Sequence, residues 1–305
     1  MTEQGRVVVV GDALIDELRD DRGVREFVGG AALNVAVGLG RLGVPTSLIA
    51  MVGEDEDGAH IRAYLGDFEV ELIATASPRG TSRAVSVRSR AGEPEYVFNE
   101  AAKSRRIRFG DAERSAIAVA PYVVISCFPF DDVAQTLELA DAVRGAALVI
   151  DPNPRSGLLT DRAEFVRGFE QLVADAALIK VGDDDAQLLY GVELDELRAR
   201  LIDLGASAVL ATHGAAGATL EAADVLVTRP VSTLPGAIVD TMGAGDATLA
   251  AAVALLVADR PQDEDAWALA LERAMDVAAA TCRFEGALLR LPSALLDVDL
   301  ESLGT

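Results

Sequence analysis

The residues best suited to chemistry in this chain lie in one stretch, Asp240–Asp246, which reads Asp-Thr-Met-Gly-Ala-Gly-Asp. An apolar run from Ala247 to Leu256 follows and predicts a helix. The small residues before this helix leave three backbone amides uncovered by side chains, and such amides bind anions with help from the helix dipole. The amides belong to Gly243, Ala244 and Gly245. Asp246 at the edge of this site could accept a proton from an attacking hydroxyl, so the stretch indicates phosphoryl transfer.

The same residues are also typical of an ordinary Gly-rich turn between a strand and a helix, with Asp246 as a first-turn acid favoured by the dipole. Ala237–Val239, directly before the stretch, predicts the end of a short buried strand. The full run with an Asp at each end is more specific than Gly-x-Gly-Asp alone. It resembles the second signature of the ribokinase-like carbohydrate kinases, the pfkB family, whose pattern is Asp-Thr-x-Gly-Ala-Gly-Asp.

A second Gly-rich run, Gly29–Gly43, contains apolar residues at the spacing of a helix face and ends on a glycine typical of a helix terminus. Taken alone, it could be a tightly packed helix in which Asn34 is a satisfied core polar group. The run also resembles the first signature of the same family, which continues through a strand at Thr46–Val52 into Gly-x-Asp-x-x-Gly at 53–58. The resemblance implies that Gly29, Gly30 and Asn34 contact the sugar.

Two more groups of polar residues follow strands whose carboxyl ends meet at one edge of an open α/β sheet. Arg6–Val10 predicts a buried first strand with Asp12 after it, where Asp12 could also be a simple turn former. Ala147–Ile150 predicts another strand, and the loop after it reads Asp-Pro-Asn-Pro-Arg. This loop is a good turn, and it resembles the Asp-Pro-Asn-x-Arg of the fructokinase and ketodeoxygluconate kinase branches. The substrate residues implied here are Asp12, Asp151, Asn153 and Arg155, the last one near a phosphate.

The resemblance also implies a nucleotide side. The strand Leu178–Val181 precedes a helix start at 182–189 where the family has Asn-x-x-Glu, the acid organising Mg²⁺ through water. This chain has Gly182 and Asp185 in those places, so the phosphate contact of the Asn is absent or supplied elsewhere. Acids there are also explained by dipole complementarity alone. The implied nucleotide residues are Lys180, Asp185, Thr212, Gly214, Gly217 and Gly286. Asp240 is the candidate for a monovalent cation such as K⁺.

Composition limits the function classes. The net charge of −22 disfavours nucleic acids and anionic membranes as partners, so the charge of ATP must be met locally by amides and Mg²⁺. No apolar segment is long enough to span a membrane, and no signal peptide precedes the first strand, which predicts a cytoplasmic protein. Cys127 and Cys282 lie in apolar settings and are predicted to be reduced thiols, with a bridge between them as the alternative.

The elements that position these residues alternate between strand and helix, which predicts one α/β domain over residues 1–305. The resemblance implies a ribokinase-like three-layer α/β/α sandwich with a mainly parallel sheet and a small β lid formed by segments at about 13–28 and 70–100. Asp16–Val28 is charged and reads as irregular, whereas Glu69–Thr75, Ser82–Arg88 and Tyr96–Phe98 predict strands and Ala91–Pro94 a turn. A homodimer through the lid is one further expectation.

The sequence therefore predicts an ATP-dependent sugar kinase in which Asp246 is the base and the amides of 243–245 stabilise developing charge. Fructose is the first choice of acceptor, with 2-keto-3-deoxygluconate or ribose next. No P-loop and no Gly-x-Gly-x-x-Gly after the first strand is present, which disfavours P-loop and nicotinamide enzymes. From another class, a non-catalytic sugar- or nucleotide-binding relative stays an alternative.

Overall fold

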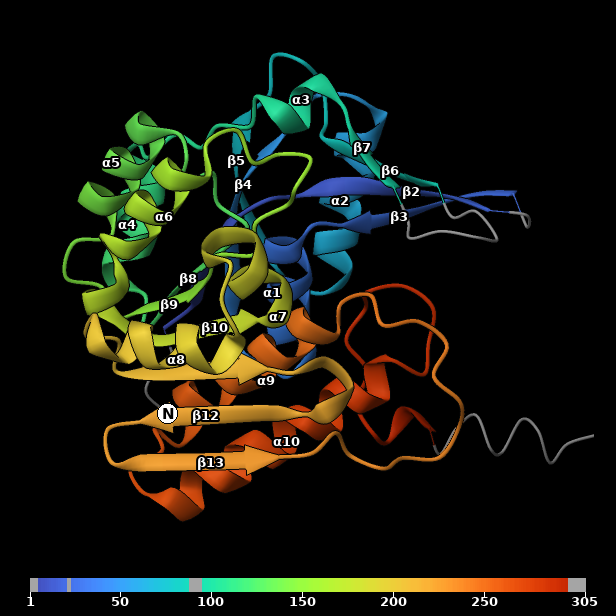
Figure 1. Ribbon diagram of the computed structural model, residues 1–305. Coiled ribbons are helices and arrows are strands. Elements are labelled where there is room, and N and C mark those ends of the chain that lie inside the picture. The colour runs from blue at the N-terminus through green and yellow to red at the C-terminus, as the bar shows by residue number, and fades with distance from the viewer. Residues whose placement is uncertain (1–4, 21–22, 88–94, 296–305) are drawn as a thin grey trace, which may run out of the picture.

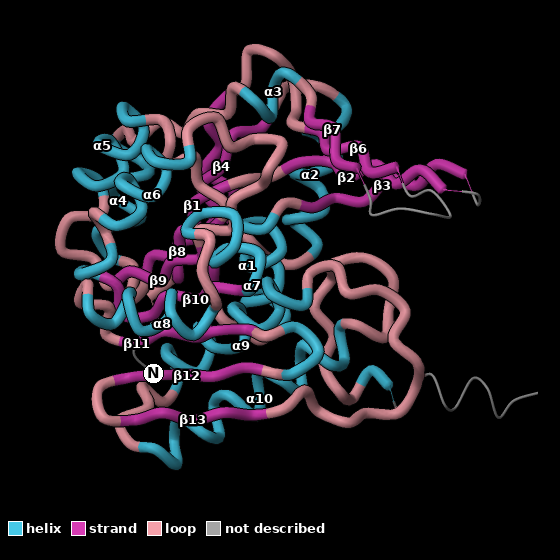
Figure 2. The backbone as a smooth tube through the Cα atoms, in the orientation of Figure 1, coloured by secondary structure: helices cyan, strands magenta, loops and turns pink. Residues whose placement is uncertain are grey.

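A nine-stranded sheet in the order β13-β12-β11-β10-β9-β8-β1-β4-β5 organises the computed structural model, which describes residues 5–20, 23–87 and 95–295 (Figures 1 and 2). The strands from β5 to β11 pair in parallel, and β12 and β13 extend the sheet antiparallel at one edge. The strands are β1 (Val7–Gly11), β4 (Thr46–Val52), β5 (Glu71–Ala76), β8 (Val123–Ser126), β9 (Leu148–Asp151), β10 (Ala176–Gly182), β11 (Ala208–Thr212), β12 (Ala218–Ala222) and β13 (Val225–Arg229).

Helices cover both faces of this sheet and give three layers (Figure 1). One face carries α1 (Ala31–Arg41), α2 (Glu56–Asp67), α9 (Ala244–Ala258) and α10 (Glu264–Thr281), and the other carries α4 (Asp111–Val119), α5 (Val133–Ala142), α6 (Arg162–Glu170) and α8 (Leu194–Asp203). Short helical turns are α3 (Glu100–Lys103), α7 (Asp183–Asp185), a π-helical turn at Ala186–Tyr190 and 3₁₀ turns at Val173–Asp175 and Gly214–Ala216. The predicted α/β/α sandwich is confirmed.

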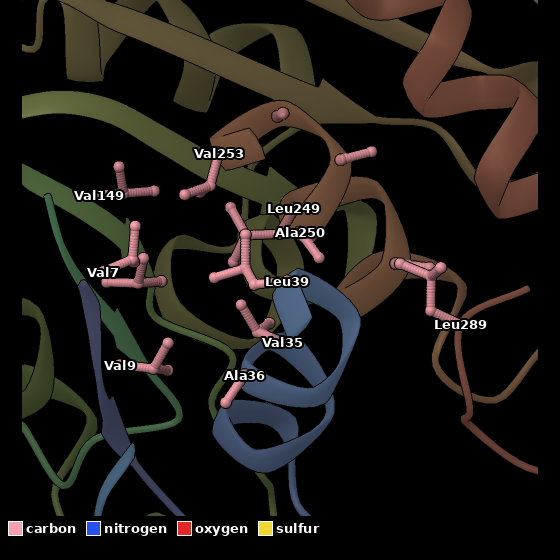
Figure 3. Packing of buried hydrophobic residues seen from close by; sticks show 14 of the residues in the cluster. Val7, Val9, Val35, Ala36, Leu39, Val149, Leu249, Ala250, Val253 and Leu289 are labelled. Atoms are coloured by element: carbon pink, nitrogen blue, oxygen red, sulfur yellow. The ribbon is translucent and has the colours of Figure 1, made fainter. Parts of the chain in front are cut away.

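The central strands are buried along their whole length because helices lie on both sides of them. Every residue of β1 and of β4 is buried, as expected for parallel strands of β-branched and aliphatic residues. Figure 3 shows Val7 and Val9 of β1 facing the layer in which α1 and α9 pack against each other. The predicted strands Arg6–Val10 and Thr46–Val52 are confirmed within one residue.

Helices α1 and α9 approach closely and run in the same direction, so their N-termini lie at the same edge of the sheet. A Cβ added at Gly38 would lie only 2.9 Å from the Cβ of Ala250, so glycine permits this approach. Leu39 of α1 and Leu249 and Val253 of α9 fill the space between the helices and the sheet (Figure 3). Packing far from the site thereby sets the spacing of the two helix starts.

A second, four-stranded sheet in the order β3-β2-β6-β7 projects from the body as the lid (Figure 1). Its strands are β2 (Leu14–Asp20), β3 (Gly23–Gly29), β6 (Arg83–Val87) and β7 (Glu95–Phe98). The expectation that Asp16–Val28 is irregular is wrong, because β2 and β3 pair along seven residues each. Strand β5, expected in the lid as part of 70–100, instead pairs in parallel with β4 in the large sheet. The predicted turn Ala91–Pro94 lies outside the described residues.

Two smaller expectations concern the cysteines and the membrane. Cys127 and Cys282 are both free thiols, the first buried and the second partly buried, so they do not form the alternative bridge. Across the described ranges, no helix is both long enough and apolar enough to cross a membrane.

Candidate active site

The carboxyl ends of the central strands bring the predicted polar residues together at one edge of the sheet. The pairing register places Gly11 of β1 beside Ser126 of β8, and Ser126 beside Asp151 of β9. Asp12 and Cys127 therefore follow at the same level on neighbouring strands. This is the edge at which open parallel sheets bind their ligands, and the N-termini of α1 and α9 point to it.

The two signature stretches meet through a direct contact between their polar side chains. Asn34, in the first turns of α1, donates a hydrogen bond from Nδ2 to Oδ2 of Asp246 in the first turn of α9, at 2.8 Å. These residues are 212 positions apart in sequence. Asp246 is buried, and its second oxygen has no partner among the described residues. The candidate base is thus held in one orientation with one oxygen left for a ligand.

Burial sets the protonation of Asp246. Loss of water raises the pKa of this carboxyl to about 6, with a further rise from the charge of Asp151 and an opposing effect of the Asn34 hydrogen bond. A group with a pKa near 6 is mostly ionised at neutral pH, yet it is a stronger base than an exposed aspartate. The site can therefore take a proton from a hydroxyl group.

The backbone before α9 turns through a conformation that requires glycine. Gly243 has φ 75°, and a Cβ there would lie 2.6 Å from the Cα of Ala287 in the terminal loop. The amide of Ala244 donates to the carbonyl of Thr241 at 3.2 Å. Among the described residues, the amides of Gly243 and Gly245 have no acceptor. The predicted trio of free amides is therefore reduced to two that can receive an anion without breaking a contact.

A buried ion pair borders the candidate anion site. Lys180 of β10 donates to Asp151 at 3.2 Å to Oδ1 and 3.3 Å to Oδ2, and the Lys180 ammonium would lie only 3.2 Å from a Cβ at Gly245. Burial opposes the charge of Lys180, but Asp151 and Asp185 raise its pKa above the usual range. The lysine therefore stays cationic beside the free amide of Gly245, where it can contact a phosphate.

The predicted sugar side holds one acid that the sequence interpretation missed. Asp12 accepts a hydrogen bond from the amide of Ala32 at 3.0 Å, which ties it to the start of α1. Asp16 on β2 lies under Gly29, where a Cβ would be 2.2 Å from its Oδ2. Burial, and then the charge of Asp12, raises the pKa of Asp16 to about 7. Its position four residues after Asp12, at the start of the segment first interpreted as irregular, was the available signal.

The loop after β9 adds one more charge. Asn153 has φ 39°, a left-handed conformation that asparagine tolerates better than most residues. Arg155 is exposed, and its side chain makes no hydrogen bond or ion pair with the part of the chain that the structure describes. Partial loss of water around the guanidinium works against its charge, but nearby groups, including Asp246 and Asp12, raise the pKa of Arg155 further above its ordinary value.

On the predicted nucleotide side, Asp185 is buried and its Oδ2 accepts the amide of Gly182 at 2.7 Å. Burial raises the pKa of Asp185 to about 6. A Cβ at Gly182 would lie 3.3 Å from Oγ1 of Thr212, so the hydroxyl of Thr212 borders the space that the family's Asn side chain would enter. Within residues 5–20, 23–87 and 95–295, no cluster of three ligating side chains could hold a metal by itself.

The remaining predicted positions are glycines and one acid at the ends of loops. Gly214 and Gly217 flank the turn after β11, and a Cβ at Gly217 would lie 2.1 Å from the carbonyl oxygen of Arg229. That glycine is thus required by strand packing, apart from any role with a nucleotide. Asp240 accepts the amides of Met242 at 3.1 Å and Gly286 at 3.3 Å, which brings the two predicted loops into contact.

One element before the Asp240–Asp246 stretch differs from the prediction. Ala237–Val239 forms no strand, and the side chains of Ile238 and Val239 are 66% and 61% exposed. The place beside β11 is taken by the antiparallel β12, so this apolar segment has no strand to pair with. It runs as a loop beside the terminal segment, where Val239 donates to the carbonyl of Cys282 at 2.8 Å.

Comparisons with known proteins show the family and the fold of this chain. The family model described as pfkB family carbohydrate kinase matches residues 4–294. A fructokinase of Rhizobium leguminosarum bv. trifolii is 30% identical over 236 residues, which are 73% of this chain and 72% of that protein. An ATP-dependent 6-phosphofructokinase of Thermoanaerobacterium thermosaccharolyticum is 26% identical over 94% of this chain and 90% of its own length. The crystal structure of a fructokinase from Xylella fastidiosa with bound ATP has the same fold, with a TM-score of 0.80 at 20% identity over 98% of this chain and 99% of that one.

Proposed function

Because the chain belongs to the pfkB family of carbohydrate kinases, and is thus an ATP-dependent phosphotransferase, we propose that its acceptor is fructose or a related ketose. The observation that carries the phosphoryl-transfer chemistry is the buried Asp246 carboxylate, which Asn34 orients beside the amides at the start of α9. The relative from Rhizobium leguminosarum bv. trifolii, a fructokinase, supports a ketose as the acceptor.

The proposed reaction is an in-line displacement. Asp246 takes the proton from one sugar hydroxyl, whose oxygen forms a bond to the γ-phosphorus of ATP, while the bond from that phosphorus to the β–γ bridging oxygen breaks and ADP leaves. The amides of Gly243 and Gly245 and the ammonium of Lys180 stabilise the charge that develops on the transferred group. Asp12, Asp16 and Asn34 hold the sugar hydroxyls.

Magnesium fits this site as part of the nucleotide. Asp185 is the acid that the sequence predicts to organise Mg²⁺ through water, but its carboxylate already accepts a hydrogen bond from the amide of Gly182. A hard cation that keeps most of its waters needs few protein carboxylates, so phosphate oxygens and water would supply its remaining ligands and Asp185 would act through water. When bound, Mg²⁺ neutralises part of the phosphate charge. A monovalent cation near Asp240 stays a prediction.

The lid supplies the proposed closure over the sugar. Asp16 comes from β2, and Arg83 of β6 forms ion pairs with Asp57 of α2 and with Glu17 and Glu26 of the lid. These contacts connect the lid to the body beside the residues that are proposed to bind the sugar. Closure of the lid can therefore exclude water from the reacting groups. The predicted dimer would use the edge strands β3 and β7, and light scattering at several protein concentrations tests it.

The direct test of the proposed function is ADP formation from ATP and Mg²⁺ over a panel of acceptors. The panel contains fructose, ribose, 2-keto-3-deoxygluconate, nucleosides and, because one matched relative is a 6-phosphofructokinase, fructose 6-phosphate. We expect one ketose to raise turnover strongly above the ATPase background, and replacement of K⁺ by Na⁺ or tetramethylammonium tests the cation. A panel with no active acceptor would contradict the assignment and favour a binding role.

The pH dependence of turnover should report on Asp246. Its pKa is raised to about 6 by burial, and a base acts only when deprotonated, so kcat/KM is expected to rise with pH through about 6 and to level off above 7. Replacing Asn34 with Ala removes a hydrogen bond that lowers this pKa, so the acid limb should move to higher pH. An acid limb that stays in place in the Asn34→Ala variant would assign it to another group.

A further inference from the structure

Arg105 is a cation at the sugar side that the reaction described above does not use. It follows α3 and lines a narrow pocket that also includes Asp12, Ser82 and Cys127, where the lid meets the large sheet. The same side chain borders the adjoining open cleft of ≈ 560 Å³ beside Asp131 and Thr160. Arg105 therefore lies between the side chains that are proposed to bind the sugar and the solvent.

The guanidinium of Arg105 lacks a partner in the described part of the chain. Its Nε is buried without a hydrogen-bond acceptor, and no carboxylate of the described residues pairs with it. The neighbouring Arg106, in contrast, pairs with Glu138 at 3.0 Å. The chain has 49 Asp and Glu against 27 Lys and Arg, so acids to pair with are abundant. A buried donor without an acceptor is costly, which indicates that a ligand supplies the acceptor.

The guanidinium of Arg155, which also has no side-chain partner among the described residues, acts on the same pocket wall. Burial raises the pKa of the Cys127 thiol to about 12, and the charge of Asp12 raises it as well. Arg105 and Arg155 both act on Cys127 in the opposite direction. The two arginines come from the segment after α3 and the loop after β9. The charges of both act on Cys127, which lines the pocket beside Arg105.

We propose that Arg105, together with Arg155, binds an anionic substituent of the acceptor sugar, so that the enzyme acts on a sugar phosphate or a sugar acid in preference to a neutral sugar. The inference rests on the proposed function, since it concerns the acceptor of that same reaction. Within fructose and its relatives, it replaces neutral fructose by an anionic relative as the preferred acceptor. Planar guanidinium groups match phosphate and carboxylate with two parallel hydrogen bonds. The anionic group would accept a hydrogen bond from the buried Nε of Arg105 and balance the charge of that guanidinium.

The position of Arg105 indicates which end of the sugar carries the anionic group. Arg155 is among the charges that most perturb Asp246, along with Asp151 and Lys180. Arg105 instead shares its pocket with Asp12 and Ser82, at the base of the lid. The anionic group bound by Arg105 would thus lie beside Asp12 and Ser82, at the end of the sugar away from the hydroxyl that Asp246 deprotonates.

The test compares kcat/KM for fructose, fructose 6-phosphate and 2-keto-3-deoxygluconate in the wild type and in Arg105→Gln. We expect one anionic acceptor to exceed fructose by at least about 100-fold, and the substitution to lower that selectivity ratio by about 10- to 100-fold, as for the loss of hydrogen bonds to a charged group. The acceptor whose selectivity ratio falls in Arg105→Gln shows whether the bound group is a phosphate or a carboxylate. Arg105→Lys keeps the charge but not the planar fork, so an intermediate ratio is expected.

The matched control is Arg106→Gln, because that side chain is engaged by Glu138 and lies one residue away. A wild type that prefers fructose, or an Arg105→Gln variant with an unchanged ratio, overturns the inference while the kinase assignment stands. A higher KM for ATP alone would assign Arg105 to the nucleotide and overturn it too.

If no acceptor is turned over, calorimetry can still measure whether the full chain binds fructose 6-phosphate or 2-keto-3-deoxygluconate. This measurement tests the inference separately from the kinase assignment. Binding that Arg105→Gln weakens at least 10-fold supports the inference while the kinase assignment fails. No binding of either sugar overturns the inference.

Discussion

Replacing Asp246 with Asn is expected to lower kcat by about 10²- to 10⁴-fold, the range that a positioned general base contributes. The amide has nearly the same shape as the carboxylate but cannot take the proton of the acceptor hydroxyl. Because Asp246 is oriented by Asn34 and contributes little binding surface, the KM for the sugar should change much less. Steady-state ADP formation with the best acceptor of the panel measures both constants.

The same substitution should not unfold the protein. The pKa of Asp246 is raised to about 6 in the folded chain, above its value in an unfolded chain, so the ionised carboxylate costs stability at pH 7. A neutral Asn removes that cost, and the melting temperature is expected to stay equal or rise. This is the trade between stability and activity that is common at catalytic sites.

A suitable control is Asp263→Asn at the start of α10. Asp263 accepts the amide of Ala266 at 2.9 Å, and Asn serves equally well as a helix N-cap, so kcat should stay at the wild-type value. Turnover of Asp246→Asn within about tenfold of wild type would remove Asp246 as the base.

The second large effect concerns stability and the ion pair of Lys180 with Asp151. Replacing Lys180 with Met is expected to lower the free energy of unfolding by about 3 to 5 kcal/mol, because it leaves a fully buried carboxylate without its partner. Urea unfolding at pH 7 measures the loss. The loss should shrink at pH 5, since protonation of Asp151 in the folded variant then removes the uncompensated charge.

The chain has its own control for this substitution, since Lys103 and Lys180 are its only lysines. Lys103 pairs with Glu100 at 3.3 Å on an exposed surface, and Lys103→Met should cost no more than about 1 kcal/mol. The double variant Lys180→Met, Asp151→Asn should recover most of the stability. Equal losses in the two lysine variants would contradict a structural role for the buried pair.

The double variant also separates structure from chemistry. If it is stable but its kcat is lower by about 100-fold or more, the Lys180 ammonium acts on the transferred phosphate beside Gly245, as proposed. If it is stable and fully active, Lys180 has only a packing role, and the free amides of Gly243 and Gly245 carry the anion site alone.

Local patterns were enough to predict many elements and the order of the motifs. Strands such as β1 and β4 are continuous apolar runs that can only be buried, and α1 and α9 begin where small residues precede a helical apolar pattern. The two signatures are short continuous stretches of sequence, and their resemblance to the family patterns was enough to predict the family and the fold. These features depend on residues that are neighbours in the chain, so no three-dimensional information was needed.

Where pairing partners matter, the sequence misled. Ala237–Val239 has the composition of a strand but no strand beside it, and β5 has the look of a lid strand but pairs with β4. A strand is defined by hydrogen bonds to a neighbour, and the identity of that neighbour is not written in its own residues. The prediction that the charged segment Asp16–Val28 is irregular was wrong for the same reason. A projecting hairpin has few buried apolar residues, so its sequence does not show the pattern of a strand.

By itself, the sequence determined which residues could do chemistry, namely the acids, amides and lysine of the recognised motifs. Only the tertiary structure decided which of them meet and in what state of charge. The contact of Asn34 with Asp246 and the burial that raises the pKa of Asp246 both arise from segments distant in the chain. The same is true of the pocket in which Arg105 Nε has no acceptor among the described residues. Desolvation and charge pairing depend on what surrounds a group in space, and that is fixed only when the sheet and its helices pack.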